Sequence, residues 1–195
     1  MIHAIALTAL TIAAAAHAQT VGVTIEIDEP VLAPGESTTV RLVASFPGDD
    51  YALASINMDL LFDSPIADPS RHWSNVSLVS PFDGDPGRLD ASGATFAGIA
   101  VGQIHFPAAG IYADPTNPIA FWRATFTAPL DAGRFYEVDL LTAVSRFDVY
   151  FDRDSSTRDS RLDVLVEGEA TISVVPAPAG AAVLALGLLA IRRRR

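Results

Sequence analysis

Residues 23–46, VTIEIDEPVLAPGESTTVRLVASF, decide the fold of this chain. Apolar and polar residues alternate on both sides of Pro34-Gly35, so that Val23, Ile25 and Ile27 share one face of the first run. A period of two is typical of a β-strand that faces a core on one side and solvent on the other. Pro and Gly end such runs and turn the chain. The stretch therefore predicts two β-strands separated by a turn.

The same alternation extends along most of the chain, and no convincing amphipathic helix interrupts it between the two ends. Further candidate strands lie at residues 54–62, 76–79, 95–106, 119–128, 135–144, 147–151 and 162–173. In three strands the residues expected to face the core are Thr38, Val40, Leu42, Ala44 and Phe46, then Ala54, Ile56, Met58, Leu60 and Phe62, and last Leu162, Val164, Val166, Ala170 and Ile172. Strands with one apolar face need a second sheet to cover it. About nine short strands therefore predict an all-β, antiparallel β-sandwich, with a barrel as the alternative.

Composition excludes several classes of protein. The 195 residues include 23 acidic residues, 13 Arg and no Cys, and the formal net charge is -10. A general nucleic-acid binder needs a cationic surface, and a disulfide scaffold or a thiolate metal site needs Cys. Residues 19–175 hold all 23 acidic residues and nine of the Arg, a formal net charge of -14. We expect one strongly acidic domain over this range.

The first 18 residues, MIHAIALTALTIAAAAHA, predict a secretory signal peptide. An apolar run is followed by Ala16-His17-Ala18, the small-x-small pattern that signal peptidase cleaves after Ala18. The alternative is an N-terminal membrane anchor. About 12 apolar residues are, however, too few to span a hydrocarbon core of about 30 Å.

The last residues form three parts in a fixed order. Val175-Pro176-Ala177-Pro178 is followed by an apolar stretch over residues 179–191 and then by Arg192, Arg193, Arg194 and Arg195. The apolar stretch predicts a short transmembrane helix, and the Arg cluster should stay cytoplasmic by the positive-inside rule. This orientation leaves the domain on the far side of the membrane, in agreement with a signal peptide.

Residues 176–195 resemble the PEP-CTERM sorting signal of Gram-negative, exopolysaccharide-producing bacteria, with Ala177 where Glu is usual. The resemblance implies that a membrane-embedded exosortase cuts near Val175-Pro176-Ala177-Pro178 and passes the protein from the inner membrane to the cell surface or the extracellular matrix. The alternative is a plain C-terminal tail anchor without processing.

The domain resembles cohesin-like, Ig-like and related carbohydrate-binding sandwiches. Residues 23–46 are similar to their first two strands, INMDLLFDSPI at 56–66 to the strand that follows, and FWRATFTAPLDAGRFYEVDL at 121–140 and LDVLVEGEATISVV at 162–175 to their final hairpins. Gly168 marks a candidate bulge. Cohesins bind a dockerin helix pair through one sheet face, so the resemblance implies protein binding through a sheet face.

No catalytic constellation is present in the sequence, so we assign no catalytic residue and expect no enzyme. A metal hypothesis rests on Asp152, Asp154 and Asp159, because Ca²⁺ prefers several oxygen ligands on a flexible loop. The alternative is a solvated loop neutralised by its own Arg153, Arg158 and Arg161. A second candidate, Asp83-Gly84-Asp85-Pro86-Gly87 with Asp90, is also explained by a plain turn.

Two aromatic residues are candidates for ligand contact, since exposed rings stack on sugars. Trp73 lies in the polar stretch SRHWSNVS, and Tyr112 lies in GIYADPTNP. Trp122, by contrast, sits in a strand pattern and is expected in the core.

Together these features predict an exported, non-enzymatic binding or structural module of the cell surface, with a polysaccharide or a surface protein as its partner. The alternatives are a secreted glycoside-active hydrolase, whose two carboxylates would meet only in the fold, and a calcium-dependent carbohydrate-binding module. No other cofactor and no nucleic acid are expected.

Overall fold

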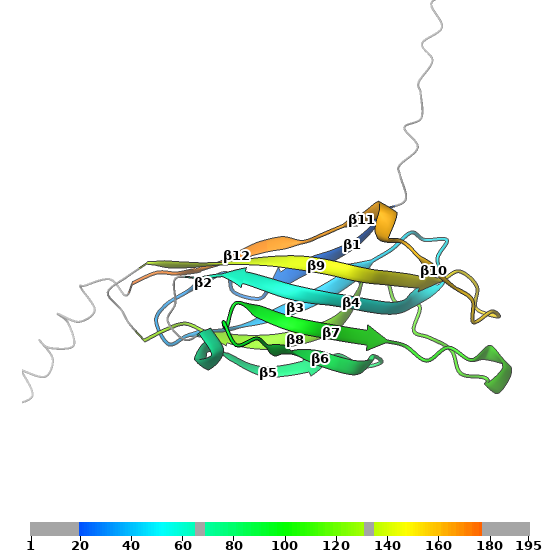
Figure 1. Ribbon diagram of the computed structural model, residues 1–195, viewed down its shortest axis with the longest axis horizontal. Coiled ribbons are helices and arrows are strands. Elements are labelled where there is room, and N and C mark those ends of the chain that lie inside the picture. The colour runs from blue at the N-terminus through cyan, green and yellow to red at the C-terminus, as the bar shows by residue number, and fades with distance from the viewer. Residues whose placement is uncertain (1–19, 65–68, 131–134, 177–195) are drawn as a thin grey trace, which may run out of the picture.

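A computed structural model describes residues 20–64, 69–130 and 135–176 of the chain as two β-sheets packed face to face (Figure 1). In these residues the strands are β1 (Val21–Ile27), β2 (Val31–Leu32), β3 (Ser37–Ser45), β4 (Ala52–Asp63), β5 (Trp73–Leu78), β6 (Asp83–Leu89), β7 (Thr95–Gly102), β8 (Ile119–Thr127), β9 (Tyr136–Tyr150), β10 (Arg158–Ser160), β11 (Leu165–Val166) and β12 (Glu169–Val174). Short 3-10 helices are η1 (Pro69–His72), η2 (Pro107–Ala109) and η3 (Leu162–Val164).

The first sheet has the strand order β11-β1-β3-β8-β5, and the second has the order β2-β12-β9-β4-β7-β6, with β10 beside β9. The prediction of an all-β sandwich is confirmed. The prediction of a purely antiparallel arrangement is wrong, because β1 pairs with β11 and β2 pairs with β12 in parallel. Both parallel pairs involve two-residue strands that lie where the chain passes between the sheets.

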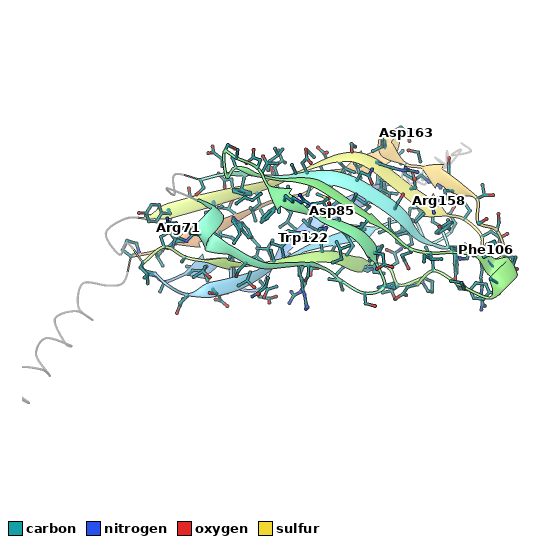
Figure 2. All side chains as sticks on the ribbon, turned by 60° about the horizontal axis from the view of Figure 1, so that its bottom comes forward. Arg71, Asp85, Phe106, Trp122, Arg158 and Asp163 are labelled. Carbon is teal, nitrogen blue, oxygen red and sulfur yellow. The ribbon has the colours of Figure 1, made fainter. Side chains whose placement is uncertain are left out.

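The core lies between the two sheets and follows the predicted alternation. Val23, Leu42 and Leu60 are fully buried, and so is Trp122 on β8, at the centre of the view in Figure 2. Ile56, Met58 and Phe62 also belong to this core, as expected. Ala54 does not, because register shifts in β4 between Leu53 and Ser55 turn it to the opposite face, where it joins a small separate cluster.

Several segments differ from the sequence prediction. The predicted strand 95–106 ends at Gly102 as β7, and the residues after Gly102 begin the loop to β8. The two strands predicted at 135–144 and 147–151 are one long strand, β9 (Tyr136–Tyr150), whose pairing with β4 contains register shifts. Residues 83–87 form part of strand β6, paired with β7, rather than a plain turn. The predicted last strand, 162–173, is not one strand with a common face. It is divided into η3 and β11 before Gly168 and β12 after it, and Val166, which was expected in the core, is 57% exposed.

Gly168 lies where the chain crosses from β11 in the first sheet to β12 in the second. A Cβ at this position would come within 2.5 Å of the Val23 carbonyl oxygen on β1. The Gly168 N–H donates a hydrogen bond of 2.8 Å to the Thr142 hydroxyl, which fixes the crossing segment against β9. Gly is therefore required here by close backbone approach. The prediction of a bulge inside a strand is wrong, because Gly168 lies between β11 and β12 rather than within a strand.

Candidate binding surfaces

A shallow hollow of about 870 Å³ lies on the outward face of the second sheet, and we call it the sheet hollow. Its outward-facing residues come from β4, β7, β9 and β12 and are Leu61, Asp63, Thr95, Asp139, Leu141, Glu169 and Thr171. Leu61 and Leu141 are direct cross-strand partners, 36% and 45% exposed. The sheet hollow thus has an apolar pair on two central strands, where a polar outward face is the norm for a sandwich.

The next rung of the same face carries two carboxylates. Asp63 on β4 and Asp139 on β9 are direct cross-strand partners, and both are exposed. The Thr171 hydroxyl donates a hydrogen bond of 2.7 Å to Asp139, and Glu169 lies beside Leu141. Like charges directly opposite each other destabilise a sheet. This rung therefore favours any cation that comes to lie on it.

Two Leu doublets in the sequence are a signal for the Leu61–Leu141 pair. Both residues follow another Leu, in Asp59-Leu60-Leu61 and Asp139-Leu140-Leu141. In a strand, consecutive side chains point to opposite faces, so a Leu doublet puts one Leu outward. The cross-strand register that brings the two outward Leu together could not be read from the sequence.

A second hollow, of about 440 Å³, lies at the end of the sandwich where β4 begins and β9 ends, and we call it the end hollow. It is lined by Phe46, Gly48, Asp49, Asp50, Tyr51, Pro115, Asn117, Phe151, Asp152 and Arg153. The Asn117 side chain donates to the Phe46 carbonyl at 2.7 Å and accepts from the Phe46 N–H at 3.3 Å. These bonds join two segments of the lining of the end hollow.

Three arginines at this end lie over aromatic rings. Their guanidinium carbons lie 4.6 Å, 5.4 Å and 4.5 Å from the ring centroids for Arg153 over Tyr112, Arg158 over Tyr150 and Arg161 over Phe151. Each of these arginines therefore contacts an aromatic ring, and the alternative of a loop neutralised by its own arginines stays a prediction. Arg161 does form an ion pair, but with Asp50 from a distant part of the chain, at 2.8 Å.

Asp50 belongs to the lining of the end hollow, and its side chain is completely buried. Burial away from water raises the pKa of Asp50, and the hydrogen bond from Arg161 opposes this effect. Asp50 Oδ1 accepts the Arg161 bond, while Oδ2 has no hydrogen-bond partner among the described residues. A carboxylate in this position holds the Arg161 guanidinium in place.

The loop between β7 and β8 closes over the same end of the second sheet. The Gln103 amide donates to the Leu53 carbonyl at 2.9 Å and accepts from the Asp114 N–H at 2.7 Å. The His105 imidazole accepts the Ala113 N–H at 3.1 Å. Figure 2 shows Phe106 at the projecting tip of this loop, with Arg158 on the same side of the molecule. The base of the loop is thus fixed while its tip extends into solvent.

The two aromatic candidates of the sequence analysis lie in different environments. Tyr112 is 42% exposed and lies beside Arg153, at the predicted calcium loop. Trp73 is only 8% exposed, and its ring packs against Phe62, Phe96 and Phe126. The prediction that Trp73 lies in an exposed loop is wrong, because Trp73 begins β5 and points into the core.

Asp152, Asp154 and Asp159 lie on the segment that follows β9, and Asp159 is part of β10. One carboxylate oxygen of Asp152 accepts the Asp154 N–H at 2.9 Å. Among the described residues, no group of three or more His, Cys, Asp or Glu side chains is arranged to hold a metal ion. The calcium site stays a sequence-based prediction.

The terminal motifs fall mostly outside the described residues. Ala16, Ala18, Ala177, Pro178 and the cluster Arg192–Arg195 lie there, whereas Val175 and Pro176 directly follow β12. The Val175 N–H donates to the Leu32 carbonyl at 2.9 Å, so the packed domain extends to the first residue of the predicted sorting motif. Within the described ranges, no helix has the length and apolarity that a membrane crossing requires.

Comparison with known proteins bears on the fold. No protein-family model matches the sequence, and no curated protein matches it. The seventh ScaB type I cohesin from Pseudobacteroides cellulosolvens superposes with a TM-score of 0.50, at 14% sequence identity, over 82% of this chain and 95% of the cohesin. The fold of this chain is cohesin-like.

Two other cohesin structures are more distant from this cohesin-like chain. The type I cohesin–dockerin complex of OlpC from Clostridium thermocellum gives a TM-score of 0.47 at 16% identity, over 80% of this chain and 96% of that chain. The second type II cohesin module of the ScaA scaffoldin from Acetivibrio cellulolyticus gives 0.46 at 10% identity, over 82% and 98%. At these identities the likeness is one of fold.

Proposed function

We propose that this chain is an exported, non-enzymatic protein-binding module that docks a basic, amphipathic segment of a partner protein on the sheet hollow. The observation that carries the proposal is the outward cross-strand pair Leu61–Leu141 next to the carboxylate pair Asp63–Asp139. The resemblance to cohesins, for which protein binding through one sheet face is implied, supports the same role.

The apolar part of the sheet hollow supplies the hydrophobic contact. Leu61 and Leu141 keep 36% and 45% of their surface exposed in the free chain. Covering an apolar side chain is worth about 25 cal/mol per Å² of surface removed from water. A partner that presents aliphatic side chains at helical or strand spacing would bury both leucines together.

The acidic part selects the charge of the partner. Asp63, Asp139 and Glu169 surround the leucines, and no arginine lines the sheet hollow in the part of the chain that the structure describes. Lys or Arg side chains of a partner would relieve the repulsion between Asp63 and Asp139. Binding should therefore weaken as salt screens these charges.

A photo-crosslinking experiment tests the proposal. A photoreactive phenylalanine derivative replaces Leu141 in one full-length variant, and replaces Thr125, on the outward face of the first sheet, in a matched variant. We expect one partner protein to crosslink at position 141 and not at 125. The purified partner should then lose at least about tenfold in affinity for Leu61→Asp/Leu141→Asp. Equal crosslinking at both positions, or unchanged affinity of the double variant, would contradict the proposal.

We also propose that the termini direct the chain out of the cell. The signal peptide would be removed after Ala18, and the sorting motif that begins at Val175 would be cut by an exosortase-like enzyme after the apolar tail has entered the membrane. An epitope inserted after Gly48, an exposed turn residue, reports the fate of the domain. We expect the tagged domain outside the inner membrane and mass spectra that lack both ends; a full-length cytoplasmic form would contradict export.

A further inference from the structure

We propose that the end hollow is a sugar-binding site for a neutral or amino-sugar unit of a glycan. It is formed by residues other than those of the sheet hollow, and the inference stands whether or not a protein docks there. The site combines an aromatic platform, a rim of planar charged side chains and a buried group that holds the platform.

Phe151 is the platform. It follows the last residue of β9, is 41% exposed and lines the end hollow. The Arg161 guanidinium lies 4.5 Å from its ring centroid, and Arg161 does not line the hollow. One side of the ring is therefore held by a cation, while the ring contributes exposed surface to the hollow. The C–H face of a pyranose packs on such a ring because the ring face is apolar and carries the negative part of the ring quadrupole.

Arg161 and Asp50 hold the Phe151 ring in place. Arg161 donates a hydrogen bond of 2.8 Å to Asp50, whose side chain is completely buried. A ring that is already ordered loses little conformational entropy when a ligand stacks on it. Asp50 is thus a positioning residue for Phe151, acting through Arg161.

The rim carries the polar recognition. The carboxylates of Asp49 and Asp152 and the guanidinium of Arg153 line the same hollow as Phe151. Each is a planar group with two adjacent acceptors or donors, which matches neighbouring hydroxyls on a sugar ring. Burying these charges under an apolar protein segment would leave them unpaired, at a high cost in desolvation. A hydroxylated ligand fits this mixture better.

Charge decides among sugars. Asp49 and Asp152 outnumber Arg153 on the exposed rim, and the chain carries a formal net charge of -10. An acidic glycan would be repelled, whereas a neutral ring or one with an ammonium group would not. The expected ligand class therefore consists of neutral and amino-sugar oligosaccharides.

A glycan array of neutral, amino-sugar and acidic oligosaccharides tests the proposal with the full-length chain. Isothermal titration of the bound glycans then compares wild type with Phe151→Ala, Phe151→Trp and Asp50→Asn. The matched control is Phe135→Ala, which removes an exposed Phe, 54% exposed, at the opposite end of β9. We expect neutral or amino-sugar glycans to bind. The affinity should fall at least about tenfold in Phe151→Ala and less in Asp50→Asn, stay within about twofold in Phe135→Ala, and persist in Phe151→Trp.

Several outcomes would overturn this assignment. These are an array on which no glycan binds, a preference for acidic glycans, and equal affinities for wild type and Phe151→Ala. Circular dichroism and melting temperature of each variant separate loss of the site from loss of the fold. Failure of the Leu61→Asp/Leu141→Asp experiment would leave this result unaffected, because the two hollows share no lining residue.

Discussion

The indole N–H of Trp122 donates a hydrogen bond of 2.8 Å to the backbone carbonyl of Pro86, and this bond joins the two sheets. Trp122 lies on β8 of the first sheet, and Pro86 lies on β6, the edge strand of the second. The bond gives the one polar atom of a fully buried indole its partner.

Trp122→Phe should lower the free energy of unfolding by about 2–3 kcal/mol, because it leaves a small cavity and an unpaired carbonyl. Urea unfolding measures the change. Trp73→Phe is the control, since it removes the same atoms from a second buried indole, which packs among phenylalanines. A loss in Trp122→Phe no greater than that in Trp73→Phe would show that the inter-sheet bond contributes little.

Gly168→Ala should lower the free energy of unfolding by about 1–3 kcal/mol, the usual range for overpacking. The added methyl group would meet backbone rather than a flexible side chain, so β1 and the crossing segment must separate. The comparison is Gly48→Ala, where a Cβ meets nothing within 4 Å and a change within about 0.5 kcal/mol is expected. Similar urea midpoints for the two variants would argue against this account of the crossing.

Asp63→Asn should stabilise the free chain by about 0.2–1 kcal/mol at low salt, because it removes the like charge opposite Asp139. The gain should shrink in about 1 M NaCl, where exposed charges are screened. Thermal melts at the two salt concentrations measure both effects. Asp83→Asn is the control, since the cross-strand partner of Asp83 is Gly102. If both variants gain equally, repulsion within the sheet hollow is not the cause.

The stability of the chain should depend on the ionisation of Asp50. Burial raises the pKa of Asp50 in the folded chain above its ordinary value of 3.8. Folding therefore binds protons at this site. Its contribution is fully present below the unfolded pKa and is lost as the pH rises through the folded pKa. As the pH is raised from 3.8, the melting temperature of wild type should thus fall relative to that of Asp50→Asn. A difference that stays constant over this range would contradict the prediction.

The sequence predicted the sandwich because period-two alternation survives in most strands; Val40, Leu42, Ile56 and Phe62 are all buried as expected. It failed where pairing overrides local pattern. Residues 83–87, rich in Gly and Asp, form an edge strand only because β7 lies beside them. The parallel pairs of β2 and β11 likewise depend on where the crossing segments meet distant strands, which no local pattern encodes.

The candidate surfaces were harder to predict than the fold. Tyr112 stays a predicted ligand contact, and its contact with Arg153 joins segments about 40 residues apart in sequence, which no local pattern predicts. Trp73 had equally polar neighbours and is buried, because a strand turns alternate side chains inward whatever precedes it. Asp50 and Arg161 meet across a separation of 111 residues, and only the folded chain brings them together.

Strand β9 sets a distance between the two ends of the molecule. Its 15 residues, at about 3.3 Å each, span roughly 50 Å, with Phe151 beyond one end and Val174, opposite Tyr136, at the other. If the chain is attached to a surface through a carrier fused after Val175, the length of β9 separates the end hollow from that surface. A carrier fused at Thr20 would instead lie close to the end hollow and obstruct it. The reason is that the start of β1 pairs with Ser45, and the next residue, Phe46, lines the end hollow. The choice of fusion terminus therefore determines whether a large glycan can reach the hollow.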